Sequence, residues 1–251
     1  MPSLRSCTSW AWAGVITRCA RWIDHRRLQD MHYTVQKTDR APALDADFDG
    51  AAWASAQAVV VGCFREESTA HRPDVRVRVL HNGTHLFVRF HVKDRYVRSV
   101  QTAYMGPVCT DSCTEFFVRP KPGQGYFNFE VNAGGTLHLS YIEDPTFGPD
   151  GFKKWRPVDP VWARQVAIWH SLPAVVEPEI TDPVDWGNGW SFPVSLLESY
   201  VGPIGDLSGQ TWRANFYKCA DRTSHPHWAS WSPVPRLSFH LPECFGELSL
   251  A

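Results

Sequence analysis

Two neighbouring segments of the chain, 111–118 and 125–132, alternate between apolar and polar side chains. In the first segment Phe116 belongs to an apolar row, and Glu115 belongs to the opposite row. In the second, phenylalanine and valine alternate with amides and a carboxylate, Glu130. Because successive side chains of a strand point to opposite sides of a sheet, both segments are predicted to be β-strands with one polar face. Such a face is either solvated surface or the floor of a groove for a hydroxyl-rich ligand.

The chain from residue 45 onward continues this pattern. Valine alternates with arginine over 75–79, Asn82-Gly83 is a strong hairpin signal, and 86–92 returns with the same alternation. A second hairpin is predicted over 126–141, around Gly134-Gly135. Further elements are predicted as follows: strands at 162–170, 175–180, 189–194, 212–218 and 247–250, the last at a sheet edge, and a helical turn at 195–200.

Many short strands, separated by turns about every ten residues, are typical of a sandwich. The sequence therefore predicts an all-β protein, an antiparallel β-sandwich that is jelly-roll-like. Long aromatic-rich loops are expected at 144–160 and 219–242.

Length and charge narrow the range of partners. A chain of 251 residues suits one large sandwich domain. The net charge of −1 argues against nucleic acid or an anionic membrane as the partner, and no apolar run approaches the roughly 20 residues of a membrane span. The seven cysteines lack paired C-x-x-C spacing, which predicts neither a zinc site nor a disulfide framework. We expect a monomer.

The first thirty residues differ from the rest. They are basic, and Arg18 and Arg21 follow the short apolar patch 10–16, where a secretion signal would carry small residues. We expect residues 1–30 to be a disordered leader or an artefact of start-site choice, and residues 31–251 to form the folded domain. The sequence does not fix the localisation and leans only slightly to the cytoplasm.

The loop 219–242 concentrates the chemistry of a binding site. His227, Trp228 and Trp231 fall close together in it. Sugars present apolar C–H faces and hydroxyl rims, so aromatic platforms beside carboxylates and amides suit them. Structural packing of the loop is the competing explanation for each tryptophan.

Several segments resemble the carbohydrate-binding module family 9-like domains, in the family's order. These are Asp49-Gly-Ala-Ala-Trp53, Asp111-Ser-Cys-Thr-Glu-Phe-Phe, Tyr126-Phe-Asn-Phe-Glu-Val-Asn-Ala-Gly-Gly-Thr-Leu, Asn215-Phe-Tyr-Lys-Cys-Ala-Asp and Phe239-His-Leu-Pro-Glu-Cys-Phe-Gly-Glu-Leu. The resemblance covers the chain from about Met31 to its end. It implies an antiparallel β-sandwich that binds a mono- or oligosaccharide without catalysis, in the setting of polysaccharide breakdown.

The same resemblance implies site residues. Glu115 would bond sugar hydroxyls, and Trp231, with Trp228 as the alternate, would be one of two clamping rings. The other ring falls near Val108-Cys109, where this chain has no aromatic residue, and Tyr104 is the substitute that the sequence offers. Further polar contacts are expected from Asn215, Lys218, Glu130 and Asn132.

Two other functions stay open. A glycoside hydrolase would use Glu115 and Glu130, with carboxyl groups about 5 Å apart for retention or about 6.5–9.5 Å apart for inversion. A haem-binding electron-transfer sandwich would use Met105 with a histidine as axial ligands.

No metal or cofactor is predicted. Asp45, Asp47 and Asp49 are spaced like calcium ligands, and the family's sandwiches can hold structural calcium. The D-x-D-x-D-G run nevertheless lacks the bidentate glutamate of a full loop site. His225, His227 and Cys219 have spacing too irregular to indicate a metal site.

Overall fold

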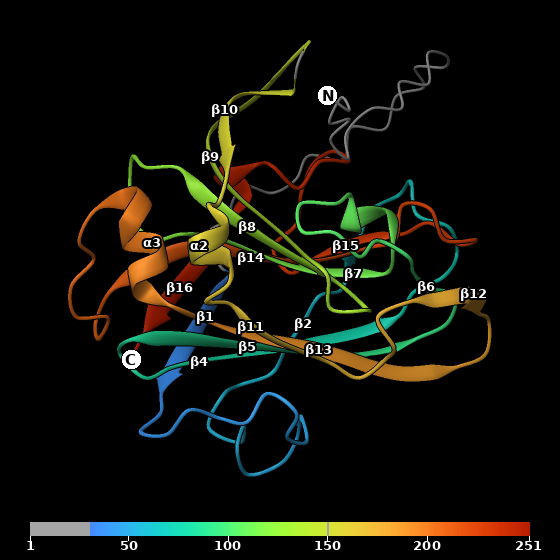
Figure 1. Cartoon of the computed structure of the whole chain (residues 1–251), viewed down its shortest axis with the longest axis horizontal. Coiled ribbons are helices and arrows are strands. Elements are labelled where there is room, and N and C mark those ends of the chain that lie inside the picture. Colours follow the sequence, from blue (N-terminus) through green and yellow to red (C-terminus); the bar gives the residue numbers. More distant parts are fainter. Residues whose placement is uncertain (1–30, 150) are drawn as a thin grey trace.

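Two main β-sheets packed face to face form most of the described part of the chain, residues 31–149 and 151–251 of the computed structural model (Figure 1). In order across the layer, sheet A contains β10 (Gly151–Pro157), β9 (Leu137–Gly148), β8 (Tyr126–Asn132), β7 (Cys113–Arg119), β14 (Thr211–Cys219), β16 (Gly246–Leu250) and β1 (His32–Lys37). Sheet B continues from β1 through β4 (Asp74–His81), β5 (His85–Asp94), β13 (Val184–Pro193) and β11 (Ala167–His170). The all-β sandwich that the sequence predicts is confirmed.

Short elements complete the two layers. Strand β15 (Trp228–Ser230) pairs with β14 and β3 (Cys63–Phe64), and β2 (Val59–Val60) pairs with β4. Strands β6 (Val97–Ser99) and β12 (Val176–Ile180) form a separate two-stranded sheet. The helical elements are η1 (Val108–Thr110), α2 (Pro160–Ala163), α3 (Val194–Val201) and η2 (Pro242–Cys244). None of the described helices is long and apolar enough to cross a membrane.

Strand β1 belongs to both sheets. Residues 32–35 pair with β16 and residues 36–37 pair with β4, and both pairings are parallel. The remaining described strand pairs are antiparallel, as in the hairpins of β4 with β5 and of β8 with β9. One strand therefore joins the two layers of the sandwich.

The main core lies between the sheets. The apolar rows predicted from alternation meet there, and the ring centroids of Phe129 in sheet A and Phe192 in sheet B are 4.3 Å apart. Phe116 and Phe216 stack within sheet A on the same inner face. Each buried side chain of this size contributes about 1.5–3 kcal/mol of apolar burial, which makes this layer the main source of stability.

The outer face of sheet A is also covered. A second apolar cluster packs there, and its largest buried members are Phe117, Tyr126, Tyr217, Phe239 and Phe245. The helical turn η1 contributes Val108 to this cover. The polar row of β7 and β8 therefore lies beneath other residues and does not face open solvent.

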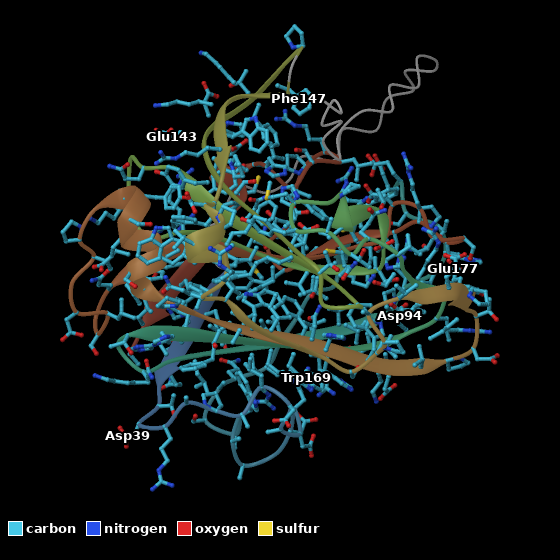
Figure 2. The ribbon with its side chains drawn as sticks, viewed as in Figure 1. Asp39, Asp94, Glu143, Phe147, Trp169 and Glu177 are labelled. Carbon is cyan, nitrogen blue, oxygen red and sulfur yellow. The ribbon has the colours of Figure 1, made fainter. Side chains whose placement is uncertain are left out.

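Three local predictions need correction. Residues 162–170 do not form one strand, because Asp159 caps α2 by accepting from the Val161 N–H, and only 167–170 is extended. The segment 144–157 belongs largely to the β9–β10 hairpin and is not a loop; this hairpin projects from the molecule, and Phe147 near its tip is 47% exposed (Figures 1 and 2). Strand β16 lies between β14 and β1 and not at a sheet edge.

Candidate functional site

Strand register builds a row of polar side chains on the outer face of sheet A. Glu115 of β7 stands opposite Glu130 of β8 on one side and opposite Tyr217 of β14 on the other. His138 of β9 stands opposite Glu130. Because directly opposite residues share a face, the four side chains form one row across four strands.

A second row runs beside the first. Cys113 of β7 is the register partner of Cys219 of β14 and of Asn132 of β8. Cys219 is also the partner of Trp228 of β15. The register therefore puts Trp228 and Glu115 on the same face of sheet A.

The two glutamates are buried, and neither is in an ion pair with a lysine or arginine of the described residues. Glu115 is 2% exposed and its Oε1 accepts a hydrogen bond from the Cys219 thiol at 2.9 Å. Glu130 is 6% exposed and accepts from the Asn128 amide at 2.8 Å. Burial raises the pKa of Glu115 well above its ordinary value, and the neighbouring Glu130 adds to that shift. Burial likewise raises the pKa of Glu130, so both side chains favour the neutral form.

Trp228 and Asp221 lie at the border of this face. The indole N–H of Trp228 donates to Oδ1 of Asp221 at 2.7 Å, which fixes the orientation of the half-buried ring. Burial raises the pKa of Asp221 to about 7. The backbone N–H of Asp221 donates to the carbonyl of Cys109, which ties this segment to η1. An aromatic surface and a carboxyl group therefore stand together.

Trp231 has a different environment from Trp228. It is 4% exposed, and its ring packs in the inter-sheet core, 5.5 Å from Phe216 between centroids. The ring also fills the space above Gly246, where an added Cβ would approach it to 2.5 Å. The placement of Trp231 does not support the expected stacking role, because the sheet separates its ring from Glu115.

Lys218 also lies on the inner side. It pairs with Thr114, one residue out of phase with Glu115, so its side chain points away from the carboxyl row. Its Nζ donates to Nε2 of His227 at 2.8 Å and lies 3.7 Å from Oδ2 of Asp94. Burial opposes the charge on Asp94, but Lys218 and a hydrogen bond from His71 outweigh burial and lower the pKa of Asp94 to about 2.

The two predicted asparagines have structural partners. The Asn215 side chain bonds the backbone N–H and C=O of Ser232 and so holds the loop after β15. The Asn132 amide donates to the carbonyl of Gln101 and to Asp111, and its oxygen accepts from the Thr136 N–H. The side-chain amides of both asparagines therefore hold neighbouring loops and turns in place.

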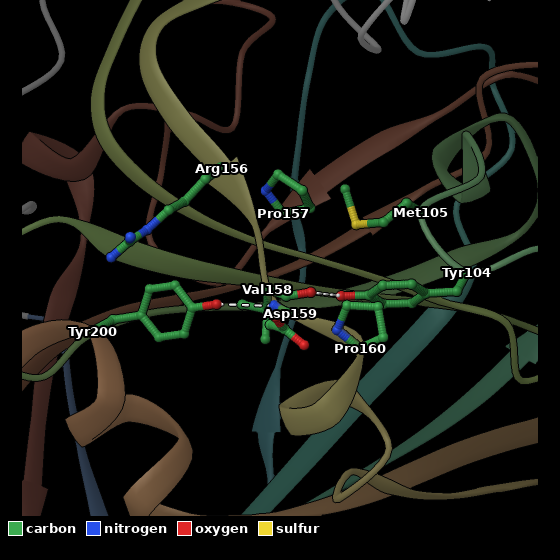
Figure 3. Close-up of a pocket in the computed structure, with 8 residues that line it drawn as sticks. All are labelled: Tyr104, Met105, Arg156, Pro157, Val158, Asp159, Pro160 and Tyr200. Atoms are coloured by element: carbon green, nitrogen blue, oxygen red, sulfur yellow. Dashed lines mark hydrogen bonds between the residues drawn. The ribbon is translucent and has the colours of Figure 1, made fainter.

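Tyr104 lines a separate surface pocket of about 510 Å³ (Figure 3). Its hydroxyl donates to the carbonyl of Val158 at 2.6 Å, and across the pocket the Tyr200 hydroxyl accepts from the Asp159 N–H at 2.9 Å. Met105 lines the same pocket, and none of the described residues that line the pocket is a histidine. Neither a ring beside Glu115 nor the axial pair of a haem site is supported by this arrangement.

The proposed calcium ligands have other partners. The two carboxylate oxygens of Asp49 bind Arg78 at 2.8 Å and Arg76 at 3.4 Å. The side chain of Asp47 accepts from the backbone N–H of Asp49. Ion pairs and a turn hydrogen bond account for these two side chains.

Several residues of the site were not among the ligand-binding residues predicted from sequence. Asp221, Asn128 and His138 join the polar row or its border, and Cys113 and Cys219 form its neighbour. The sequence could have predicted Asn128, which is two residues from Glu130 on the same strand, and His138, which lies opposite Glu130 in the predicted hairpin. It could not have predicted the pairing of Cys113 with Cys219, because the two strands are far apart in the chain.

Comparisons with known proteins agree with this architecture. A sequence model of Carbohydrate-binding family 9 matches residues 43–250. Among solved structures, a putative carbohydrate-binding protein from Bacteroides uniformis ATCC 8492 is 28% identical, with a TM-score of 0.75 over 88% of this chain and 99% of that chain. A search of curated proteins finds no match.

Two more distant structures share the fold. A family 9 carbohydrate-binding module from Caldicellulosiruptor kristjanssonii in complex with glucose is 10% identical, with a TM-score of 0.56 over 88% of this chain and 95% of that chain. The structure in complex with cellotriose is 12% identical, with a TM-score of 0.55 over 87% and 93%. Because the family match extends over most of its length, this chain belongs to carbohydrate-binding family 9.

Proposed function

We propose that this protein binds a mono- or oligosaccharide without cleaving it, at the outer face of sheet A. The family match and the two modules in complex with glucose and cellotriose support a saccharide as the ligand. The observation that carries the proposal is the placement of the half-buried Trp228 on the same sheet face as Glu115, with its N–H bonded to Asp221. We further propose that polysaccharide breakdown is the setting and that the protein acts as a monomer.

The residues of this face match the two kinds of surface on a sugar. The Trp228 ring offers an apolar platform for C–H groups, and the carboxyl groups of Asp221 and Glu115 accept bonds from hydroxyls. A carboxyl group that stays protonated also donates, so a neutral Glu115 can bond a ring or hydroxyl oxygen. The exposed border, Trp228 with Asp221, is where a ligand would arrive first.

Contact with Glu115 requires a local opening. The segment 221–222 is joined to η1 by two backbone hydrogen bonds, from the Asp221 N–H to the carbonyl of Cys109 and from the Arg222 N–H to the carbonyl of Thr110, and η1 packs on β7 and β8. Breaking both hydrogen bonds costs on the order of 2 kcal/mol, which ligand contacts can offset. We therefore propose that Asp221 and Trp228 shift when a sugar reaches Glu115.

The test is to titrate the full-length protein with glucose and with cellotriose and to measure binding by isothermal titration calorimetry. We expect saturable binding that is weakened by Trp228→Ala and by Glu115→Gln, with less effect from the second because an amide oxygen still accepts. A glycan array extends the search to other sugars. Absence of binding to every sugar on the array, with the fold intact by circular dichroism, contradicts the proposal.

A glycoside hydrolase is the second candidate. The observation in its favour is that Glu115 and Glu130 are direct cross-strand neighbours, whose Cβ atoms are typically about 4.5–5.5 Å apart. A retaining mechanism needs carboxyl groups about 5–5.5 Å apart, but it also needs one of them ionised, and burial favours the neutral form of both. Release of reducing sugar that is lost in Glu115→Gln would favour this candidate over simple binding.

A further inference from the structure

Two thiols and one carboxyl group converge on the outer face of sheet A. Cys113 and Glu115 are two residues apart on β7 and so share a face, and Cys219 of β14 is the register partner of Cys113. One ligand atom from each of the three lies within 4.8 Å of the other two, and all three residues are buried. We propose that Cys113, Cys219 and Glu115 bind a thiophilic divalent cation, with Zn²⁺ as the natural ion.

The spacing of the three atoms is near that of a tetrahedral site. Zinc binds thiolate sulfur at about 2.3 Å, which puts two sulfurs of one site about 3.8 Å apart. The three atoms therefore need to contract by at most about 1 Å from their present limit of 4.8 Å. Oε1 of Glu115 and Sγ of Cys219 are 2.9 Å apart and would separate to about 3.5 Å, the distance set by Zn–O and Zn–S bonds at a tetrahedral angle. Small side-chain rotations on two central strands complete the site and leave the fourth position to water.

A bound cation would change the protonation of these side chains. Without one, burial raises the pKa of Cys113 to about 12 and the pKa values of Glu115 and Cys219 well above their ordinary ranges. Among the described residues, no ion pair joins Glu115 or Glu130 to a lysine or arginine. A bound dication stabilises thiolates and carboxylates directly, and so offsets the cost of releasing their protons.

Binding of the ion leaves one negative charge among the ligands. Two thiolates and one carboxylate carry three negative charges, and the dication carries two positive ones. Lys218, on the other side of the sheet, acts to lower the pKa values of Cys113 and Glu115, although its ammonium lies 3.7 Å from Oδ2 of Asp94 and already balances that carboxylate.

A second group with metal ligands does not fit a cation in the same way. His71, Asp94 and His227 also bring one ligand atom each within 4.8 Å of the others. There, however, the Lys218 ammonium lies 2.8 Å from Nε2 of His227 and 3.7 Å from Oδ2 of Asp94. The Lys218 ammonium takes the position of a cation at this second group, so of the two groups found among the described residues the thiol group is the one that fits an added ion.

The experiment uses the full-length protein, reduced and stripped of metal with a chelator, and titrated with Cd²⁺. We expect one equivalent to produce the ultraviolet charge-transfer band of thiolate-bound cadmium, and excess Zn²⁺ to remove the band. The proposal does not rest on sugar binding, because the readout is the metal alone. Calorimetry with sugar on the same samples keeps the two outcomes separate, since either ligand can bind when the other does not.

Variants locate the site. Cys113→Ser and Cys219→Ser should each weaken Cd²⁺ binding at least tenfold, and Glu115→Gln should weaken it about tenfold. Cys244→Ser is the matched control, because Cys244 is a buried thiol of the same outer-face cluster outside the three-residue group, and its band should be unchanged.

Two results would overturn the inference. One is absence of the band in the wild-type protein, and the other is an undiminished band in a folded Cys113→Ser/Cys219→Ser double variant. Circular dichroism of the metal-free variants shows whether they fold. Should the cysteine variants fail to fold, Glu115→Gln decides the matter, since an unchanged Cd²⁺ dissociation constant contradicts a site that includes this carboxylate.

Discussion

The two faces of sheet A are both buried, yet they carry different chemistry. The inner face presents aromatic rings such as Phe116, Phe129 and Phe216 to the other layer. The outer face holds Glu115, Glu130 and paired thiols beneath an apolar cover. Apolar burial stabilises a fold, whereas burial of carboxyl groups without cations opposes it. Buried carboxyl groups of this kind are typical of functional sites. We therefore associate the inner face with stability and the outer face with function.

The largest expected effect tests the inner face. Trp231→Ala should lower the free energy of unfolding by about 3–5 kcal/mol, because it leaves a cavity beside Phe216 and above Gly246. Chemical denaturation measures this, with Trp228→Ala as the matched control on the outer face. Equal losses for the two tryptophans would remove the distinction between the faces.

The next effect tests the buried acids of the outer face through pH. Burial raises the pKa of Asp221 to about 7, above the roughly 3.9 of an unfolded aspartate. Between these two pKa values the folded state holds a proton that the unfolded state releases. The contribution of protonated Asp221 to the free energy of unfolding is therefore full below about pH 4 and is lost as pH rises through 7. Denaturation at several pH values should show a slope of up to about 1.4 kcal/mol per pH unit, made flatter by Asp221→Asn. An identical slope in the variant would exclude Asp221 as its source.

A smaller effect concerns ligand affinity. Trp228→Ala should weaken saccharide binding by about 1–2 kcal/mol, because the ring is half-buried and offers its free surface for stacking. Trp228→Phe, which keeps an aromatic surface, should recover part of the loss. Calorimetry on both variants checks the expectation, and unchanged affinity in Trp228→Ala would place the binding surface elsewhere.

The smallest effect belongs to a residue outside both faces. Tyr104→Phe removes the hydroxyl that bonds the carbonyl of Val158, and it should lower the free energy of unfolding by about 1 kcal/mol. Sugar affinity should stay the same, since Tyr104 lines the separate pocket of Figure 3. Altered affinity would show that this pocket takes part in binding.

Local alternation was enough to predict much of the fold. It assigned Phe116 and Glu115 to opposite faces, and the Asn82-Gly83 turn located the β4–β5 hairpin. Alternation gave no information on Trp231, whose expected role came from the family resemblance, because the strand β15 before it has only three residues and no visible period. Trp228 and Trp231 lie three residues apart, which in extended backbone puts their rings on opposite faces.

Contacts between distant segments were beyond local patterns. Cys219 and Glu115 are 104 residues apart, and their hydrogen bond exists only because β14 pairs with β7. The burial of Glu115 and Glu130 depends on the loop cover, which a strand's own alternation does not reveal. The interior position of β16 likewise follows from its parallel pairing with β1, at the other end of the described chain.

The strand shared by the two layers has a consequence for aggregation. If β1 detaches, the backbone edges of β16 and β4 are exposed at the same moment. Bare strand edges are templates on which other chains can add. Tyr33 opposes detachment of β1, because its buried hydroxyl donates a hydrogen bond to the carbonyl of Gln57 and accepts one from the Val79 N–H. The six residues of β1 therefore keep both strand edges covered as long as they stay docked.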